Sequence, residues 1–138
     1  MIRIDIRPVW RFRSGDEERA FDFQLVAILA ELDASSKLTQ AAEQAGISYR
    51  HAWNLIGDWE KFFGAPLVTK AQGRGSTLTA LGKRLLWAGR RAQARLAPEL
   101  DNLSAEFARS LNESLSETMP SLVVQASHDF AISVLRDM

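Results

Sequence analysis

Near the start of the chain, apolar and polar residues alternate and then change to a helical period. Residues 2–12 place apolar side chains at every second position, which is typical of a half-buried β-strand. Pro8 has no N–H to donate, so this strand is expected at a sheet edge or to break there. The segment "SGDEE" then predicts a turn and the acidic start of a helix. That helix is expected over about residues 17–33, where apolar residues recur at helical spacing (Phe21, Leu25, Ile28, Leu29 and Leu32).

Two further helices are predicted on either side of a glycine. The segment 38–45 presents a narrow face of small residues, and the segment 49–63 has a polar first turn followed by an apolar side. Gly46 suits the left-handed position that ends a helix, and Ser48 is a good N-cap for the next one. Two helices joined by a short turn containing glycine are typical of a helix-turn-helix, whose second helix enters the DNA major groove. An ordinary helical hairpin with a solvated polar turn is the open alternative.

A short β-hairpin is predicted directly after the second of these helices. Residues 67–70 form its first strand, residues 72–76 its glycine-rich loop, and Thr77 and Leu78 its second strand. Such a hairpin is a wing, and the long cation Arg74 at its tip could reach a phosphate or the minor groove. A plain turn with one exposed arginine is the alternative. Because an isolated two-stranded ribbon is marginally stable, the N-terminal strand is expected to pair with this hairpin.

A long helix is predicted from its cap at Thr79 to about residue 115. Its apolar positions step by threes and fours over a length that outruns a small domain, so a partner must cover them. A two-fold dimer is the simplest supplier of that partner. Pro98 removes one backbone hydrogen bond, so a kink or a restart is expected there. The residues expected at the dimer seam are Leu85, Leu96, Leu100, Leu103, Phe107 and Leu111.

Composition narrows the class of protein. The chain of 138 residues contains no cysteine, which excludes a disulfide framework and thiolate chemistry. It has no apolar run long enough to span a membrane and no signal peptide at its start, so the cytoplasm is the expected location. Consecutive residues cannot form a catalytic triad, so Ser127, His128 and Asp129 do not predict an enzyme. Neither a cofactor nor a metal is expected.

The net charge of zero conceals an uneven distribution. Residues 48–91 carry eight lysines and arginines against two acidic residues, while the segments on either side are acidic on balance. A basic block over a helix-turn-helix and its wing can attract a polyanion such as DNA. A solvated basic face is the alternative interpretation.

Two stretches resemble a known family. "TQAAEQAGISYRHAWNLI" resembles the helix-turn-helix of the molybdate-responsive ModE regulators, whose motif is AA-x-x-x-GISY-x-x-AW-x-x-I. "LVTKAQGRGSTLTALGKRLL" is similar to the wing and following helix that ModE proteins share with LysR-type regulators. The resemblance covers about residues 2–90. It implies a fold that is mainly α with a small β-sheet: a winged helix-turn-helix followed by a long dimerisation helix.

The resemblance also implies binding of double-stranded DNA by a homodimer. Four residues at the start of the second helix are expected near the bases of the major groove: Ser48, Tyr49, Arg50 and Asn54. Five others, on the second helix, the wing and the start of the long helix, are expected at the DNA backbone: Lys61, Lys70, Arg74, Ser76 and Lys83. The predicted function is a sequence-specific transcriptional regulator that binds a two-fold operator. A winged helix used for protein–protein contact is the alternative.

The domain boundaries follow from these elements. Residues 1–80 are expected to form the DNA-binding domain and residues 81–118 the linker and dimerisation helix. Residues 119–138 are similar to the start of a periplasmic-binding-protein-like effector domain, as in LysR-type regulators, which suggests a piece of a longer protein. This departs from the β-rich oxyanion-binding domains expected in ModE proteins, so molybdate sensing is not carried over. A small-molecule or oxyanion effector would bind in the missing C-terminal domain.

Overall fold

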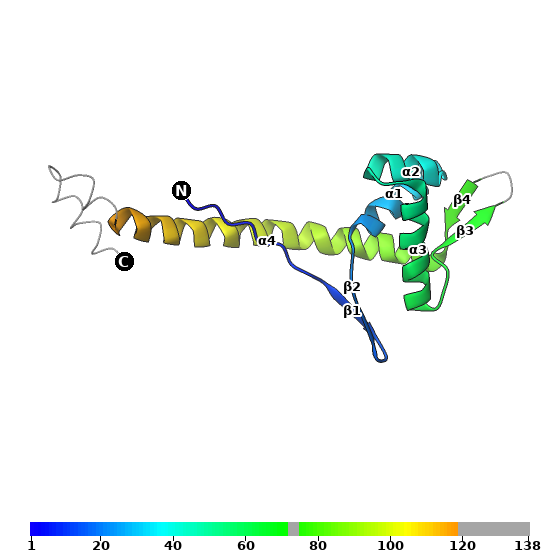
Figure 1. Ribbon diagram of the computed structural model, residues 1–138, viewed down its shortest axis with the longest axis horizontal. Coiled ribbons are helices and arrows are strands. Elements are labelled where there is room, and N and C mark those ends of the chain that lie inside the picture. Colours follow the sequence, from blue (N-terminus) through cyan, green and yellow to red (C-terminus); the bar gives the residue numbers. More distant parts are fainter. Residues whose placement is uncertain (72–74, 119–138) are drawn as a thin grey trace. The chain divides into compact units, whose positions relative to one another are not determined.

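The computed structural model describes residues 1–71 and 75–118 (Figure 1). Pro8–Ala94 form one compact unit, and among the described residues Met1–Arg7 and 95–118 form another. The expected effector-domain segment and Arg74 both lie outside the described residues. The elements are β1 (Arg11–Ser14), β2 (Glu17–Ala20), α1 (Gln24–Ser35), α2 (Leu38–Ala45), α3 (Tyr49–Phe63), β3 (Val68–Ala71), β4 (Gly75–Leu78) and α4 (Ala80–Thr118). The predicted class, mainly α with a small β-component and a long last helix, is confirmed.

The N-terminal strand differs from its prediction. Only Arg11–Ser14 are extended in a ladder, and they pair with Glu17–Ala20, which the sequence had assigned to the start of a helix. The reason is the turn between them: Gly15 has φ +60° and occupies the first of two loop positions, as in a type II′ hairpin. The expected pairing with the wing is also wrong, because β1–β2 and β3–β4 are separate two-stranded sheets.

α1 therefore begins later than predicted, at Gln24, but its buried face is the predicted one. Leu25, Ile28 and Leu29 have no exposed surface, and Leu32 is 1% exposed. The helix ends at Ser36, whose φ of +62° is the left-handed conformation that terminates many helices. The polar segment "ASSK" thus breaks the helix where the apolar period stops.

Aromatic rings fill the core between the first hairpin and α3. Trp59 on α3 is 1% exposed and lies at the centre of the cluster. Its ring centroid is 5.1 Å from that of Phe21 and 5.4 Å from that of Phe12, both in edge-to-face geometry. Arg19 on β2 extends over the same indole and bonds to Asp58 at 3.2 Å. The first hairpin therefore supports the side of α3 that faces away from solvent.

α4 begins where the sequence predicted. The Thr79 hydroxyl accepts a hydrogen bond from the Gly82 N–H at 3.1 Å, which is the expected N-cap. The helix then continues unbroken through Pro98 to Thr118, so the restart expected at that proline does not occur. Pro98 is exposed, and water can therefore satisfy the carbonyl that loses its partner. Among the described residues, no helix is long and apolar enough to span a membrane.

Candidate nucleic-acid interface

The turn between α2 and α3 has the geometry that its sequence predicts. Gly46 has φ +71°, its N–H bonds to the Glu43 carbonyl, and the Ile47 N–H bonds to the Ala42 carbonyl at 3.0 Å. These two bonds form the motif that commonly ends a helix at glycine. Ser48 then caps α3, since its hydroxyl accepts from the His51 N–H at 3.0 Å. A well-defined turn fixes the direction in which α3 leaves α2.

The first turn of α3 is exposed. Tyr49 is 49% exposed, and Arg50, His51 and Asn54 are exposed as well. The opposite side of the same helix is buried through Ala52, Leu55, Ile56, Trp59 and Phe62. The packed side anchors the helix, so the polar end is presented rigidly to solvent.

The residues predicted to contact DNA divide into groups in the structure. Arg50, Asn54 and Lys61 are separated by four and seven positions, which places them on one exposed face of α3. Ser48 uses its hydroxyl as an acceptor in the cap, and its O–H remains available to donate. Lys83 is exposed in the first turn of α4. Lys70 and Ser76 instead face α3 from the wing, as described below.

The wing is attached to the helices from two directions. The Glu60 carboxylate of α3 accepts from the Leu67 N–H at 2.7 Å and from the Val68 N–H at 3.3 Å. On the other side, the Ser76 N–H bonds to the carbonyl of Ser36 at 2.9 Å. In the sequence, Glu60 is one of the two acidic residues within the basic block of residues 48–91. Its role in holding the wing depends on the fold of the α3–β3 turn, which the local pattern does not reveal.

Two residues of the wing point to the same face because of the strand register. Lys70 and Ser76 are directly opposed in the antiparallel ladder, so their side chains project to one side of the ribbon. Thr69 and Thr77 project to the other side, where their hydroxyl oxygens are 3.0 Å apart. Ser76 is 6% exposed although it is polar. The inner face of the wing thus presents a cation and a hydroxyl.

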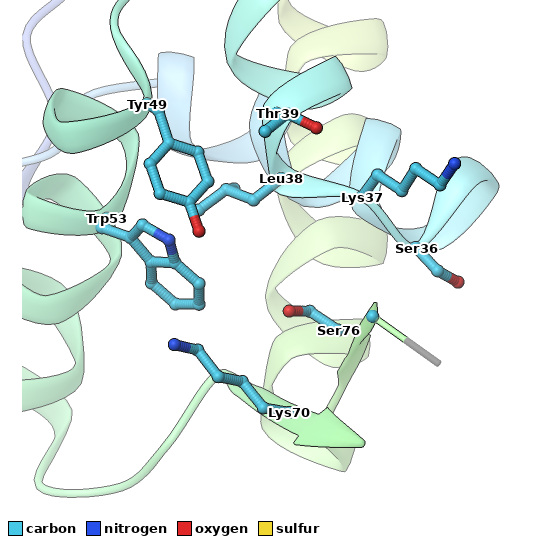
Figure 2. Close-up of a pocket in the computed structure, with 9 residues that line it drawn as sticks. Ser36, Lys37, Leu38, Thr39, Tyr49, Trp53, Lys70 and Ser76 are labelled. Atoms are coloured by element: carbon cyan, nitrogen blue, oxygen red, sulfur yellow. The ribbon is translucent and has the colours of Figure 1, made fainter. Parts of the chain in front are cut away.

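An open groove of about 450 Å³ lies between that inner face, the start of α2 and the start of α3 (Figure 2). The Lys70 ammonium lies 4.4 Å from the centroid of the Trp53 ring, and Trp53 meets Tyr49 edge-to-face at 6.2 Å. None of the residues that line the groove is acidic; they are Ser36, Lys37, Leu38, Thr39, Tyr49, Trp53, Lys70, Gly75 and Ser76. The family motif includes Trp53, but the sequence does not indicate its contact with Lys70, because only the tertiary fold brings the two residues together.

Comparison with known families gives the class of the domain. The family model described as "Bacterial regulatory helix-turn-helix protein, lysR family" matches residues 23–83, from the start of α1 to the first turn of α4. Residues 23–83 are a LysR-type helix-turn-helix domain. This LysR-type domain contains every described residue assigned above to contact with DNA. Among the described residues, no cluster of His, Asp or Glu could hold a metal ion.

The chain is similar to curated proteins over stretches longer than the 23–83 segment. The chain is 31% identical over 106 residues to the "Molybdenum-pterin-binding protein MopB" of Rhodobacter capsulatus, covering 74% of this chain and 38% of that protein. It is 35% identical over 75 residues to the "Transcriptional regulator ModE" of Yersinia pestis, covering 51% of this chain and 28% of that protein. The chain thus corresponds to well under half the length of these relatives.

A solved structure shares the fold. The structure titled "Crystal structure of Vibrio fischeri DarR in complex with DNA reveals the transcriptional activation mechanism of LTTR family members" aligns with 64% of this chain and 30% of its own. The TM-score is 0.55 and the sequence identity is 19%. The described winged helix-turn-helix therefore shares the fold of that structure.

Proposed function

We propose that this chain is a DNA-binding transcriptional regulator that binds a two-fold operator as a homodimer. The observation that carries the proposal is the exposed polar first turn of α3, next to a wing that bears cations, in a LysR-type domain. A helix presented in this way can enter the major groove with its N-terminal residues at the base edges. The DarR structure, which shares the fold, was solved with DNA.

We assign contacts with the DNA bases and contacts with the DNA backbone to different residues. Arg50, Asn54 and Tyr49 lie on the exposed side of α3 and would contact base edges; an arginine that binds guanine through two hydrogen bonds contributes about 1–3 kcal/mol of discrimination. Lys61 and Lys83 would contact phosphates, which adds affinity without sequence preference. In the same scheme Ser48 assists base contact, and Arg74, Lys70 and Ser76 provide backbone contact from the wing.

The homodimer is supported by the far half of α4. Leu103, Phe107, Leu111 and Leu115 recur at every fourth position and are 39–55% exposed. Because neighbours four apart lie on the same side of a helix, they form a continuous apolar stripe. Such a stripe on a soluble chain marks an interaction site. A two-fold pair of these helices would present two copies of α3 to successive major grooves, about 34–36 Å apart or a multiple of that distance.

A comparison of two substitutions tests the proposed function. Duplexes bound by the wild-type chain are first selected from a random pool, and the selected duplex is then compared with a scrambled one over a range of salt concentrations. Lys83→Ala should weaken binding to both duplexes equally and reduce the salt slope by about 1.8, because the proposed homodimer would lose two phosphate contacts at about 0.9 each. Arg50→Ala should weaken binding to the selected duplex far more than to the scrambled one. If both variants act alike on both duplexes, the division of roles is wrong.

A protein–protein interaction module is the second candidate function. The salt titration of duplex binding also distinguishes this candidate from a DNA-binding regulator. Phosphate contacts release counterions, so DNA binding falls steeply as salt rises. A wild-type chain that binds duplexes weakly and without a steep salt slope would favour that candidate. We also propose that a small-molecule or oxyanion effector binds in a C-terminal domain outside residues 23–83.

A further inference from the structure

The groove between α3 and the wing is lined by hydrogen-bond donors that face inwards. Figure 2 shows the Lys70 side chain extended towards the Trp53 indole and the Ser76 hydroxyl turned into the space beside it. The Lys37 ammonium, by contrast, is turned away from Trp53. Lys70 keeps donors free even while its ammonium rests on the ring, because an ammonium carries three N–H groups. The inward-facing groups thus suit an anion.

Ser76 supplies the second observation. Only 6% of Ser76 is exposed, and its hydroxyl makes no hydrogen bond to any other described residue. The hydroxyl is turned into the groove, where it can bind a water or a ligand. The strand register places this hydroxyl directly opposite Lys70 on the inner face of the wing. Ser76 and Lys70 can therefore hold one small anion between them.

Trp53 determines where the cation lies. A lysine side chain has several rotatable bonds, and fixing it costs conformational entropy. The indole face attracts the ammonium, and at 4.4 Å from the ring centroid the two are in cation–π contact. Trp53 itself is half-buried on α3 and is supported by Tyr49. Through this contact α3 positions a cation of the wing.

We propose that Trp53 is a positioning residue: its indole holds the Lys70 ammonium at the groove, so that Lys70 and Ser76 bind one phosphate of the DNA backbone. This inference rests on the proposed function and extends it. One phosphate bound between α3 and the wing fixes the depth at which α3 enters the major groove. Phosphate contacts of this kind set the register of a protein on the duplex.

A double-mutant cycle on the full chain tests the proposal. The probe is a 30-base-pair duplex of mixed sequence, because a phosphate contact does not depend on the bases. Trp53→Leu removes the aromatic face and should weaken binding about three-fold, the size of an exposed cation–π contact. In the Lys70→Met background the same change should have no effect. Equal losses in both backgrounds would overturn the proposal, since Trp53 would then act independently of Lys70.

Conservative variants exclude a merely structural role for Trp53. Trp53→Phe and Lys70→Arg each preserve a cation on an aromatic ring and should restore binding to within about two-fold of the wild type. Lys70→Met should reduce the salt slope by about 1.8, because the proposed homodimer would lose one phosphate contact in each protomer. Ser76→Ala should weaken binding, whereas Thr77→Ala, on the opposite face of the same strand, is the matched control. If Trp53→Phe binds as weakly as Trp53→Leu, the aromatic contact is not what matters and the proposal fails.

NMR gives a readout that does not depend on DNA. In the free protein the ring current of Trp53 should shift the ε-methylene protons of Lys70 upfield, and Trp53→Leu should abolish that shift. Absence of the shift in the wild type would refute the positioning role. Saturable binding of inorganic phosphate at micromolar concentration would instead identify a site for free phosphate and would also overturn the proposal.

Failure of this inference can be told apart from failure of the proposed function. If the wild-type chain binds the mixed-sequence duplex with a steep salt slope but the cycle shows no coupling, only the role of Trp53 is wrong. If the wild-type chain shows no salt-dependent binding, DNA recognition itself is wrong, and the inference falls with it.

Discussion

Two exposed regions of this molecule differ in chemistry although neither is covered by the chain. The first turn of α3 exposes tyrosine, arginine, histidine and asparagine, and Tyr49 is 49% exposed. The far half of α4 exposes leucine and phenylalanine, and Phe107 is 55% exposed. Exposed donors favour a hydrated polyanion, whereas an exposed apolar stripe favours another apolar surface. The comparison teaches that exposure locates an interaction site and side-chain chemistry selects the partner.

The largest expected effect concerns the apolar stripe of α4. Phe107→Asp places a charge in the proposed dimer seam and should convert the chain to a monomer, as measured by sedimentation. A monomer engages one half-site instead of two, so affinity for a two-fold operator should fall by about 1,000-fold through lost avidity. Ala105→Asp adds the same charge on the opposite side of α4 and is the control. If Phe107→Asp leaves the chain's sedimentation unchanged, the stripe is not a dimer seam.

The next largest effect concerns the contact between the start of α4 and the wing. A Cβ added at Gly82 would collide with the carbonyl of Leu67, where the chain enters β3. Gly82→Ala should therefore lower the free energy of unfolding by about 3 kcal/mol, measured by urea denaturation.

Gly57→Ala is the matched control for that change. A Cβ at Gly57 meets nothing within 4 Å, and the residue lies inside α3. This substitution should raise stability by about 0.5–1 kcal/mol, because alanine favours the helix. A stable Gly82→Ala variant would show that the α3–β3 turn can shift without cost and that the wing is not rigidly held.

Local signals in the sequence were sufficient to predict the helix-turn-helix. Gly46, Ser48 and the N-cap bond of Thr79 act within a few residues of themselves, and each was correctly assigned from its neighbours. The first hairpin was missed because "SGDEE" suits both an acidic helix start and a tight turn. The choice between them depends on Gly15 and on aromatic packing against Trp59, which lies far along the chain.

The candidate site was predictable only in part for the same reason. Arg50 and Asn54 lie on one helix, so helical periodicity places them together. Lys70 and Trp53 belong to different elements, and their contact depends on the turn that Glu60 stabilises. Strand register alone could have paired Lys70 with Ser76, but the buried environment of that serine follows from its backbone bond to Ser36. Long-range contacts of this kind leave no periodic signal in the sequence.

The smallest expected effect concerns Ser48, whose side chain both caps α3 and is proposed to assist base contact. Its hydroxyl caps α3, so Ser48→Ala should lower the free energy of unfolding by about 1 kcal/mol. Ser48→Asp should restore that stability, because aspartate is an equally good N-cap. Measured by urea denaturation alone, Ser48→Asp would therefore resemble the wild type.

DNA binding should rank the same three proteins differently. Aspartate at position 48 adds a negative charge beside Arg50, on the surface proposed to enter the major groove of the polyanionic duplex, so Ser48→Asp should bind duplexes worse than Ser48→Ala does. Thr79→Asp is the control, since it caps α4 with the same charge away from the first turn of α3. If Ser48→Asp binds DNA as well as the wild type, the start of α3 does not approach the duplex. The exposed polar turn of α3 would then not be a DNA-binding surface, although the apolar stripe of α4 could still be a dimer seam.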